Sequence, residues 1–186
     1  MDASTLIAKV RSGVVQVFLE RNRERLGSGS GFLTAAGLVT NRHVVPADGY
    51  DAVALRLADT NPDDPSSYIR ILQADMEASL VAQSSKDQGD FAVFKLTYQE
   101  FAGRHTFEFD PSDVRPHCGE QAVFLGFPFG MPQLTAHLGY VSAHHSINHH
   151  EVIQIDGSVN GGNSGGPLLR IDSGLVTGIV TRAVTG

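Results

Sequence analysis

The chain has 186 residues, 41% of them hydrophobic, which is enough for one domain or for two small barrels that share a cleft. Its formal charge of −6, its pI near 5.7 and the lack of a Lys/Arg cluster exclude an electrostatic grip on nucleic acid. The single cysteine, Cys118, excludes a disulfide within the chain, and no segment of the sequence is long and apolar enough to span a membrane.

The first residues bear on the location of the protein in the cell. Asp2 stands where a signal peptide needs positive charge, and Lys9 and Arg11 interrupt the apolar run that follows. No disulfide framework points to secretion either. We therefore expect a cytoplasmic protein, or a periplasmic one if a leader was removed.

Short strands between turn signals dominate the first half of the chain. Residues 2–12 carry apolar side chains at helical spacing, with Ser4 as a candidate cap, and predict a short helix. The chain has 20 glycines and 8 prolines. The short apolar runs between them favour strands over long helices in the rest of the chain. Six strand candidates, enough to close one small antiparallel barrel, follow at 14–20, 29–33, 38–40, 52–57, 69–74 and 91–96.

A polar and irregular stretch, 103–116, predicts a connection between two barrels. Five further strand candidates follow it, at 121–127, 135–143, 152–155, 167–170 and 175–181. We predict an all-β fold of two six-stranded antiparallel barrels after a short helix, with the last strand of the second barrel not visible. The predicted parts are 1–102 for the helix and first barrel, 103–119 for the connection and 120–186 for the second barrel, which together form one domain.

The segment GGNSGGP at 161–167 is the most distinctive in the chain. Ser164 lies between glycine pairs and just before an apolar run, which fits a tight turn that feeds a buried strand. The glycines remove side chains where the backbone of a ligand must approach, as a nucleophilic hydroxyl requires. A flexible linker is the alternative, and the apolar strands on both sides of the segment argue against it.

Acyl transfer by a serine needs an imidazole as base and a carboxylate that orients the imidazole. His43 ends an apolar strand, and Asp90 opens the strand at 91–96. An ordinary hydrogen bond at a strand end and a turn-capping acid remain the simpler explanations, and Asp87 competes with Asp90. A catalytic thiol at Cys118 is a weaker alternative, because turn residues flank it.

Seven short pieces of the sequence, in a fixed order, extend this pattern. They are GSGSGF at 27–32, VTNRHVV at 39–45, GDFAVFK at 89–95, GFPFG at 126–130, GYVSA at 139–143, IQID at 153–156 and GNSGGPL at 162–168. Together they resemble the trypsin-like serine peptidases, in particular the HtrA-like branch, with histidine, aspartate and serine in the order of that family. Asp87 lies three positions from the motif, so the resemblance favours Asp90.

The resemblance implies a double β-barrel with the active site between the barrels. His43 and Asp90 would come from the first barrel and Ser164 from the second. Ser164 would attack the scissile carbonyl, His43 would act as base and then as acid, and Asp90 would orient the imidazole. The backbone N–H groups of Gly162 and Ser164, with Asn163 between them, would form the oxyanion hole.

The resemblance also implies where a substrate side chain would lie. The pocket would be lined by Ser158, Val159, Asn160, Val180, Thr181, Arg182 and Ala183. Val159 and Ala183 would make it small and apolar, favouring Val, Ala or Leu at the cleaved position. Ser158 stands where trypsin-like enzymes that cleave after Lys or Arg carry an aspartate, and Arg182 could contact acidic groups of the substrate.

The function that follows is a serine endopeptidase acting on unfolded or extended polypeptides without a cofactor. Asn163 replaces the aspartate that pairs with a new N-terminus in digestive relatives, so we expect control by loop ordering or by an attached domain. Relatives add a strand after the position of Gly186, so we expect the natural chain to continue. An oligomer could form through Phe18 or Leu26, although core burial is the simpler expectation for both.

Three other functions remain open from the sequence. A peptidase-like binding module with a latent site would keep all three catalytic side chains. An esterase could use the same nucleophile, but the strand–serine–helix elbow of the α/β-hydrolases is absent. Four histidines, His144, His145, His149 and His150, could bind a transition metal, although no acid or cysteine completes a ligand set and we expect no functional metal site.

Overall fold

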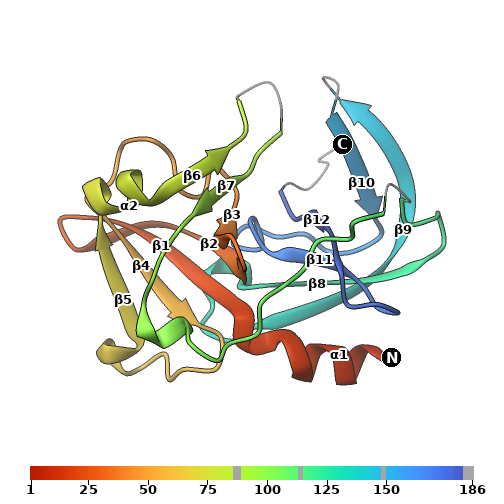
Figure 1. The fold of residues 1–186 in the computed structure, drawn as a ribbon, viewed down its shortest axis with the longest axis horizontal. Helices are drawn as coiled ribbons and strands as arrows, with labels where there is room; N and C mark the ends of the chain where they lie inside the picture. The colour runs from red at the N-terminus through yellow and green to blue at the C-terminus, as the bar shows by residue number, and fades with distance from the viewer. Residues whose placement is uncertain (86–88, 113–114, 148–149, 182–186) are drawn as a thin grey trace.

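The computed structural model describes residues 1–85, 89–112, 115–147 and 150–181. Two curled antiparallel sheets lie side by side, and a short helix at the N-terminus runs along the second of them (Figure 1). The predicted all-β fold of two antiparallel sheets is confirmed. In these residues no helix has the length and apolar character needed to cross a membrane.

The first sheet has seven strands where six were predicted, in the order β5-β4-β1-β2-β3-β7-β6. The strands are β1 (Val14–Arg21), β2 (Glu24–Thr34), β3 (Gly37–Thr40), β4 (Ala52–Leu57), β5 (Tyr68–Leu72), β6 (Leu80–Gln83) and β7 (Ala92–Phe94). The strand predicted at 69–74 ends at Leu72, and helix α2 (Gln73–Ser79) follows because Met76 turns into the core. Strand β6 escaped prediction because it is mostly exposed and shows no apolar alternation.

The second sheet has five strands in the order β10-β9-β8-β11-β12. They are β8 (Gln121–Gly126), β9 (Thr135–Ile147), β10 (His150–Ile155), β11 (Pro167–Arg170) and β12 (Val176–Ile179). All five were predicted, and within the described part of the chain no sixth strand joins them. Strands β10 and β12 are therefore the edges of this sheet.

Helix α1 (Ala3–Val10) begins one residue later than predicted and has a different cap. The carboxylate of Asp2, rather than the Ser4 hydroxyl, accepts the N–H of Thr5 at 2.9 Å. Leu6 and Val10 lie on one face and are buried. That face holds the N-terminus against the core of the second sheet.

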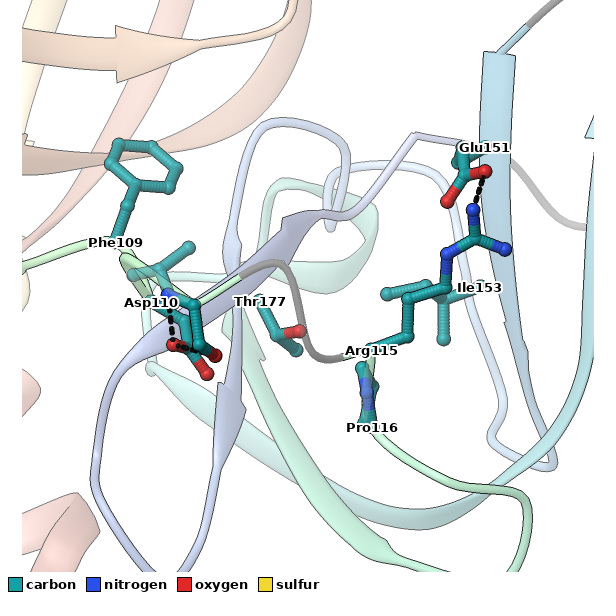
Figure 2. Close-up of a pocket in the computed structure, with 9 residues that line it drawn as sticks. Phe109, Asp110, Arg115, Pro116, Glu151, Ile153 and Thr177 are labelled. Carbon is teal, nitrogen blue, oxygen red and sulfur yellow. Dashed lines mark hydrogen bonds and ion pairs between the residues drawn. The ribbon is translucent and has the colours of Figure 1, made fainter.

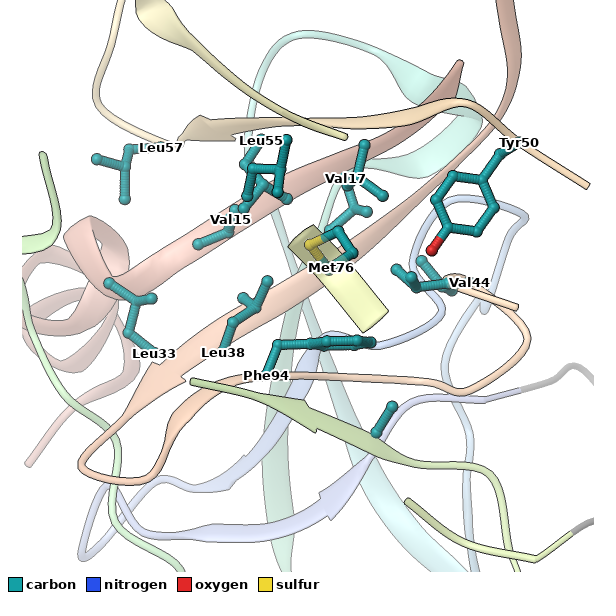
Figure 3. Packing of buried hydrophobic residues seen from close by; sticks show 14 residues of the cluster. Val15, Val17, Leu33, Leu38, Val44, Tyr50, Leu55, Leu57, Met76 and Phe94 are labelled. Carbon is teal, nitrogen blue, oxygen red and sulfur yellow. The ribbon is translucent and has the colours of Figure 1, made fainter. Parts of the chain in front are cut away.

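The hydrophobic core connects the two sheets. One cluster fills the first sheet, with Leu38 and Phe94 packed beneath β1 and β4 (Figure 3). A second cluster combines Phe32 of β2 with Val123 of β8 and Leu169 of β11. Because side chains from both sheets share this cluster, neither sheet can bury its apolar face without the other.

The two candidate contact residues near the β1–β2 hairpin differ in exposure. Phe18 is only 4% exposed, as expected for a core residue, and the guanidinium of Arg25 lies 3.8 Å from its ring centroid. Leu26 is 51% exposed, which corrects the expectation that it would be buried. It lies where the hairpin extends beyond the core.

We predict that Phe32→Ala will lower the free energy of unfolding by about 3–5 kcal/mol, because it opens a cavity where the sheets meet. The control Leu26→Ala should change it by less than about 0.5 kcal/mol, since that side chain is exposed. Urea titration followed by the amide signals of β1 and β8 measures both quantities. The two strands should unfold at the same urea concentration, and separate transitions would contradict a shared core.

Candidate active site

His43 and Asp90 meet at one end of two paired strands. Thr40 ends β3 and pairs with Ala92, the first residue of the antiparallel strand β7, so the chain leaves β3 and enters β7 at the same edge. Asp90 Oδ2 lies 2.5 Å from His43 Nδ1, and the backbone N–H of His43 donates to Asp90 Oδ1 at 3.1 Å. The Asn41 amide holds the backbone of Asp90 by donating to its carbonyl at 2.6 Å. The carboxylate thus fixes both the backbone and the ring of His43.

Ser164 lies in the loop before β11, and its backbone is bound to the first sheet. The N–H of Ser30 in β2 donates to the Ser164 carbonyl at 2.8 Å. A Cβ on Gly165 would lie 2.0 Å from the Ser30 carbonyl oxygen, so only glycine permits this approach. Direct backbone contact therefore positions Ser164 against the sheet that carries His43.

Thr181 connects the acid and the serine. Its hydroxyl donates to Asp90 Oδ2 at 2.8 Å, and its carbonyl accepts the Ser164 hydroxyl at 3.0 Å. His43, Asp90 and Ser164 are thus brought together, but within the described residues the Ser164 hydroxyl bonds to Thr181 and not to the imidazole. Sequence reasoning placed Thr181 in the pocket wall and missed its bond to Asp90. Thr181 was the last residue of the strand predicted at 175–181, whereas β12 ends at Ile179, so no strand pattern pointed to this contact.

The backbone of Gly162 is held in place from two sides. Its φ of 96° and a would-be Cβ only 2.3 Å from the Phe127 carbonyl oxygen require glycine. The Ser30 hydroxyl donates to the Gly162 carbonyl at 2.7 Å and accepts the N–H of Phe127 at 3.0 Å. Ser30, which sequence reasoning did not single out, therefore connects both segments to the first sheet.

The N–H groups of the same loop divide into used and free donors. The Asn163 N–H donates to the Asn160 carbonyl at 3.1 Å. The N–H groups of Gly162 and Ser164 donate to no main-chain carbonyl of the described residues. The Asn163 side chain is fully buried, and neither of its amide atoms has a hydrogen-bond partner in that part of the chain.

The predicted substrate pocket is only partly described. Val159 packs against the buried cluster that contains Phe124 and Val180. Ser158 is exposed, and Asn160 is half-buried. Arg182 and Ala183 lie outside the described residues, and so does Asp87.

A cavity of about 540 Å³ lies elsewhere, and none of His43, Asp90 and Ser164 lines it. Figure 2 shows Phe109 and Asp110 on one side of it and Arg115 with Glu151 on the other. Arg115 and Glu151 form an ion pair whose side chains are more than half exposed, so solvent screens it. The cavity reaches both edge strands of the second sheet and is separate from the serine.

The histidine-rich hairpin gathers no group of three or more His, Cys, Asp or Glu in the described residues. His144 Nε2 donates to the Pro116 carbonyl at 2.8 Å, and His145 Nε2 donates to Gln154 Oε1 at 2.7 Å. His149 lies outside the described residues. Two of the four imidazoles thus act as local hydrogen-bond donors.

The charge of Asp90 depends on two opposing effects. Burial raises the pKa of this carboxyl, but hydrogen bonds from His43 and Thr181 outweigh burial and lower the pKa to about 2. Asp90 is therefore ionised at neutral pH and holds the imidazole by a charge-assisted bond.

The chain is similar to known proteins over most of its length. The model of a family described as the trypsin-like peptidase domain matches residues 29–179. A probable periplasmic serine endoprotease DegP-like from Chlamydia pneumoniae is 34% identical over 165 residues, covering 85% of this chain and 29% of that protein. A protein of the same description from Ectopseudomonas mendocina is 34% identical over 172 residues, covering 89% and 31%. The chain thus spans less than a third of the length of these relatives, and they bear out the HtrA-like resemblance.

The fold also has a counterpart among solved structures. The serine endoprotease from Yersinia pestis superposes with a TM-score of 0.74 and 24% identity, over 98% of this chain and 58% of that one. Identity this low supports the shared fold only.

The expectation of a cytoplasmic protein is wrong. The relatives from Chlamydia and Ectopseudomonas are named periplasmic, which points to the periplasm. The expectation rested on two features not seen in the sequence, a signal peptide and a disulfide, and neither absence identifies a compartment. A chain that can build a hydrophobic core of this size also needs no disulfide outside the cytoplasm.

We predict that Asp90 makes stability depend on acid pH. Its folded pKa of about 2 lies below its ordinary value of 3.8, so its stabilising contribution is complete above about pH 5 and is lost as pH falls through 2. The shift corresponds to about 1–2 kcal/mol, reduced because His43 is half exposed. Urea unfolding at pH 5 and pH 2.5 should show this loss in the wild type relative to Asp90→Asn, in which the other carboxyls are unchanged. Equal losses in both proteins would contradict the pairing.

Proposed function

The chain belongs to the trypsin-like peptidase domain family, and we propose that it is a serine endopeptidase that uses Ser164, His43 and Asp90. The observation that carries the proposal is the 2.5 Å contact between Asp90 Oδ2 and His43 Nδ1, beside the loop that carries Ser164. A carboxylate in this position selects the tautomer with the proton on Nδ1 and leaves Nε2 free to accept another. The relatives named serine endoproteases support the same activity.

The reaction begins with a rotation of the Ser164 hydroxyl. It turns from the Thr181 carbonyl toward His43 Nε2, which exchanges one hydrogen bond for another. Hydrogen bonds of catalytic groups are often misaligned before substrate binds, so the resting contact at 3.0 Å does not oppose this step. As the Ser164 oxygen bonds to the substrate carbonyl carbon, its proton passes to His43 Nε2.

The tetrahedral intermediate places negative charge on the former carbonyl oxygen. We assign its stabilisation to the N–H groups of Gly162 and Ser164, while Asn163 lies between them with its N–H turned to Asn160. Such donors contribute roughly 3 kcal/mol each where they have been measured as side chains. Asp90 stays ionised and stabilises the imidazolium of His43 during this step.

Collapse of the intermediate completes acylation. The C–N bond breaks, the amine leaves with the proton from His43, and the acyl group remains on Ser164. Water then attacks the ester while His43 takes its proton, and a second tetrahedral intermediate returns the Ser164 hydroxyl and releases the carboxylic acid. No cofactor or metal enters these steps.

We propose unfolded or extended polypeptides as substrates. A strand of substrate would pair with the edge at 180–183 and place a small aliphatic side chain beside Val159 and Val180. The apolar cluster around Phe124 supports this preference, and the exposed, neutral side chain of Ser158 offers no negative charge to Lys or Arg.

We propose that 1–102, 103–119 and 120–186 act as one peptidase unit. His43 and Asp90 come from the first part and Ser164 from the third, so catalysis needs both sheets docked. Because the relatives are longer than this chain, an attached domain or loop ordering is proposed as the control of cleavage, with oligomer formation as a further means.

A second candidate function is a latent peptide-binding module. The Ser164 hydroxyl bonded to the Thr181 carbonyl favours it, because a hydroxyl held there cannot donate to His43. Persistence of that contact in the presence of substrate would silence an otherwise intact set of residues.

We predict that a fluorophosphonate probe will label the wild type and will not label Ser164→Ala, because only an activated serine attacks phosphorus. Peptide turnover should fall about 10⁶-fold in Ser164→Ala, as in other serine proteases. Ser142→Ala is the matched control, since Ser142 is an exposed serine on β9 and should label normally. A wild type that stays unlabelled even with unfolded polypeptide added would favour the binding module.

We also predict the cleavage preference. In a mixed peptide library, bonds after Val, Ala or Leu should be cleaved at least about tenfold faster than bonds after Phe, because the pocket is small. Val159→Phe should reduce cleavage after Leu more than after Ala. Mass spectrometry of the products measures both ratios. Dominant cleavage after Lys, Arg or Glu would contradict the proposed pocket.

A further inference from the structure

A buried cation in the first sheet has no role in the steps above. Arg56 of β4 is only 1% exposed, and within the described residues no carboxylate pairs with it. Among the described residues its guanidinium donates only to oxygens of carbonyl or amide groups, which are Gln16 Oε1 at 2.7 and 3.0 Å, the Thr60 carbonyl at 3.0 Å, the Leu57 carbonyl at 3.4 Å and the Pro132 carbonyl. Burying a charge without an opposite charge is costly, so this arrangement calls for a reason.

The partner of Arg56 transmits its position to the second half of the chain. Gln16 lies opposite Arg56 in the β1–β4 ladder and is fully buried. Since Oε1 of Gln16 accepts two bonds from Arg56, the other end of the amide must face away. There Nε2 donates to the carbonyls of Met131 at 2.9 Å and Gly130 at 3.2 Å. The guanidinium thus decides which end of the amide meets these carbonyls.

The segment held in this way is the Pro128–Gly130 turn. Phe129 has a φ of 56°, a region that side chains with a Cβ disfavour, and it is 69% exposed, so its own packing does not hold it there. The carbonyls of Gly130, Met131 and Pro132 are all anchored by Gln16 or Arg56. The anchoring of the following carbonyls therefore compensates for the strained conformation.

The Pro128–Gly130 turn also fixes the loop of the proposed oxyanion hole. The N–H of Phe129 donates to the Gly161 carbonyl at 2.6 Å. The chain has no cis peptide in the described residues, and in a trans peptide the carbonyl of Gly161 and the N–H of Gly162 point in opposite directions. The bond from Phe129 therefore fixes the direction of the Gly162 N–H.

We propose that Arg56 is a positioning residue that, through Gln16 and the Pro128–Gly130 turn, aims the Gly162 N–H at the developing oxyanion. The assignment depends on the proposed function, because it gives the Gly162 N–H its task. The first sheet then supplies His43 and Asp90 and also sets one oxyanion donor of the second sheet. Ser30 holds the next peptide, at the Gly162 carbonyl, from the same sheet.

Gln16→Glu tests the link between Arg56 and the turn. The new side chain has nearly the same shape and its carboxylate keeps the bonds from Arg56. It loses the N–H donors to Gly130 and Met131 and turns an oxygen toward their carbonyls. We expect kcat to fall about 10- to 100-fold with KM and the pH midpoint of the rate unchanged, since the substrate pocket and the His43–Asp90 pair are untouched. Gln16→Met, which removes the donors without adding charge, should lower kcat in the same direction.

A structural readout separates positioning from lost stability. Hydrogen exchange of the Phe129 amide should speed up in Gln16→Glu, because its acceptor loop is released. Ile71→Ala is the matched control, a buried residue of β5 whose loss should lower Tm without changing kcat or Phe129 exchange. Unchanged kcat in a folded Gln16→Glu, or an equal fall in Ile71→Ala at the same Tm, would overturn the proposal.

Loss of peptidase activity and release of the Pro128–Gly130 turn are separate outcomes. A wild type without any peptidase activity would overturn the proposed function. In that case the exchange rate of the Phe129 amide still decides whether Arg56 and Gln16 hold the turn, and an unchanged rate in Gln16→Glu and Arg56→Met would overturn the positioning role.

Discussion

The backbone contact of Ser30 with the loop at 162–165 is the interaction on which the site depends. Ser30 is fully buried, and each of its polar groups is used: the N–H binds the Ser164 carbonyl, the carbonyl accepts the Thr40 hydroxyl at 2.7 Å, and the hydroxyl binds the Gly162 carbonyl. Thr40 lies at the end of β3 that leads to His43. One residue therefore sets the serine loop of one sheet in register with the histidine strand of the other, and a buried polar group left unpaired there would cost about 1–3 kcal/mol.

Much of the strand content follows from the sequence, because apolar runs between turn signals predicted nearly all the strands. The meeting of His43 with Asp90 was expected only from the family resemblance, and in the structure the antiparallel pairing of β3 with β7 brings the two together. Strand β6, which the prediction missed, is mostly exposed and lies at a sheet edge, so its sequence shows no apolar alternation. The direction of the Ser164 hydroxyl depends on rotation about a single bond, which no sequence pattern specifies. Neither the strand pattern nor the hydrophobic core specifies the cellular location.

Asp90 and Arg56, two buried or partly buried charged side chains near the site, have opposite environments. Asp90 is partly exposed and accepts hydrogen bonds from N–H groups of His43 and the hydroxyl of Thr181, so it remains ionised at low cost. Arg56 is buried and, among the described residues, donates only to carbonyl and amide oxygens. Burial lowers its pKa without removing its charge at neutral pH. In the proposed mechanism Asp90 acts on a residue that changes its protonation, whereas in the proposed positioning role Arg56 acts on a backbone that stays in place. A planar guanidinium with five donors suits the second task because it can bind several carbonyls at once in fixed geometry.

Thr181 holds the Ser164 hydroxyl in a resting position that differs little in energy from the reactive position of the proposed mechanism. Its hydroxyl donates to Asp90 and its carbonyl accepts the Ser164 hydroxyl, so one residue is hydrogen-bonded to both ends of the proposed triad. Moving the Ser164 hydroxyl to His43 exchanges one hydrogen bond for another of similar strength, and typical bonds of this kind contribute about 1 kcal/mol. An energy difference of that size changes the ratio of the two positions by less than about tenfold. In the proposed mechanism, a substrate strand that pairs beside Thr181 would therefore need to supply only a small part of its binding energy to favour the reactive position.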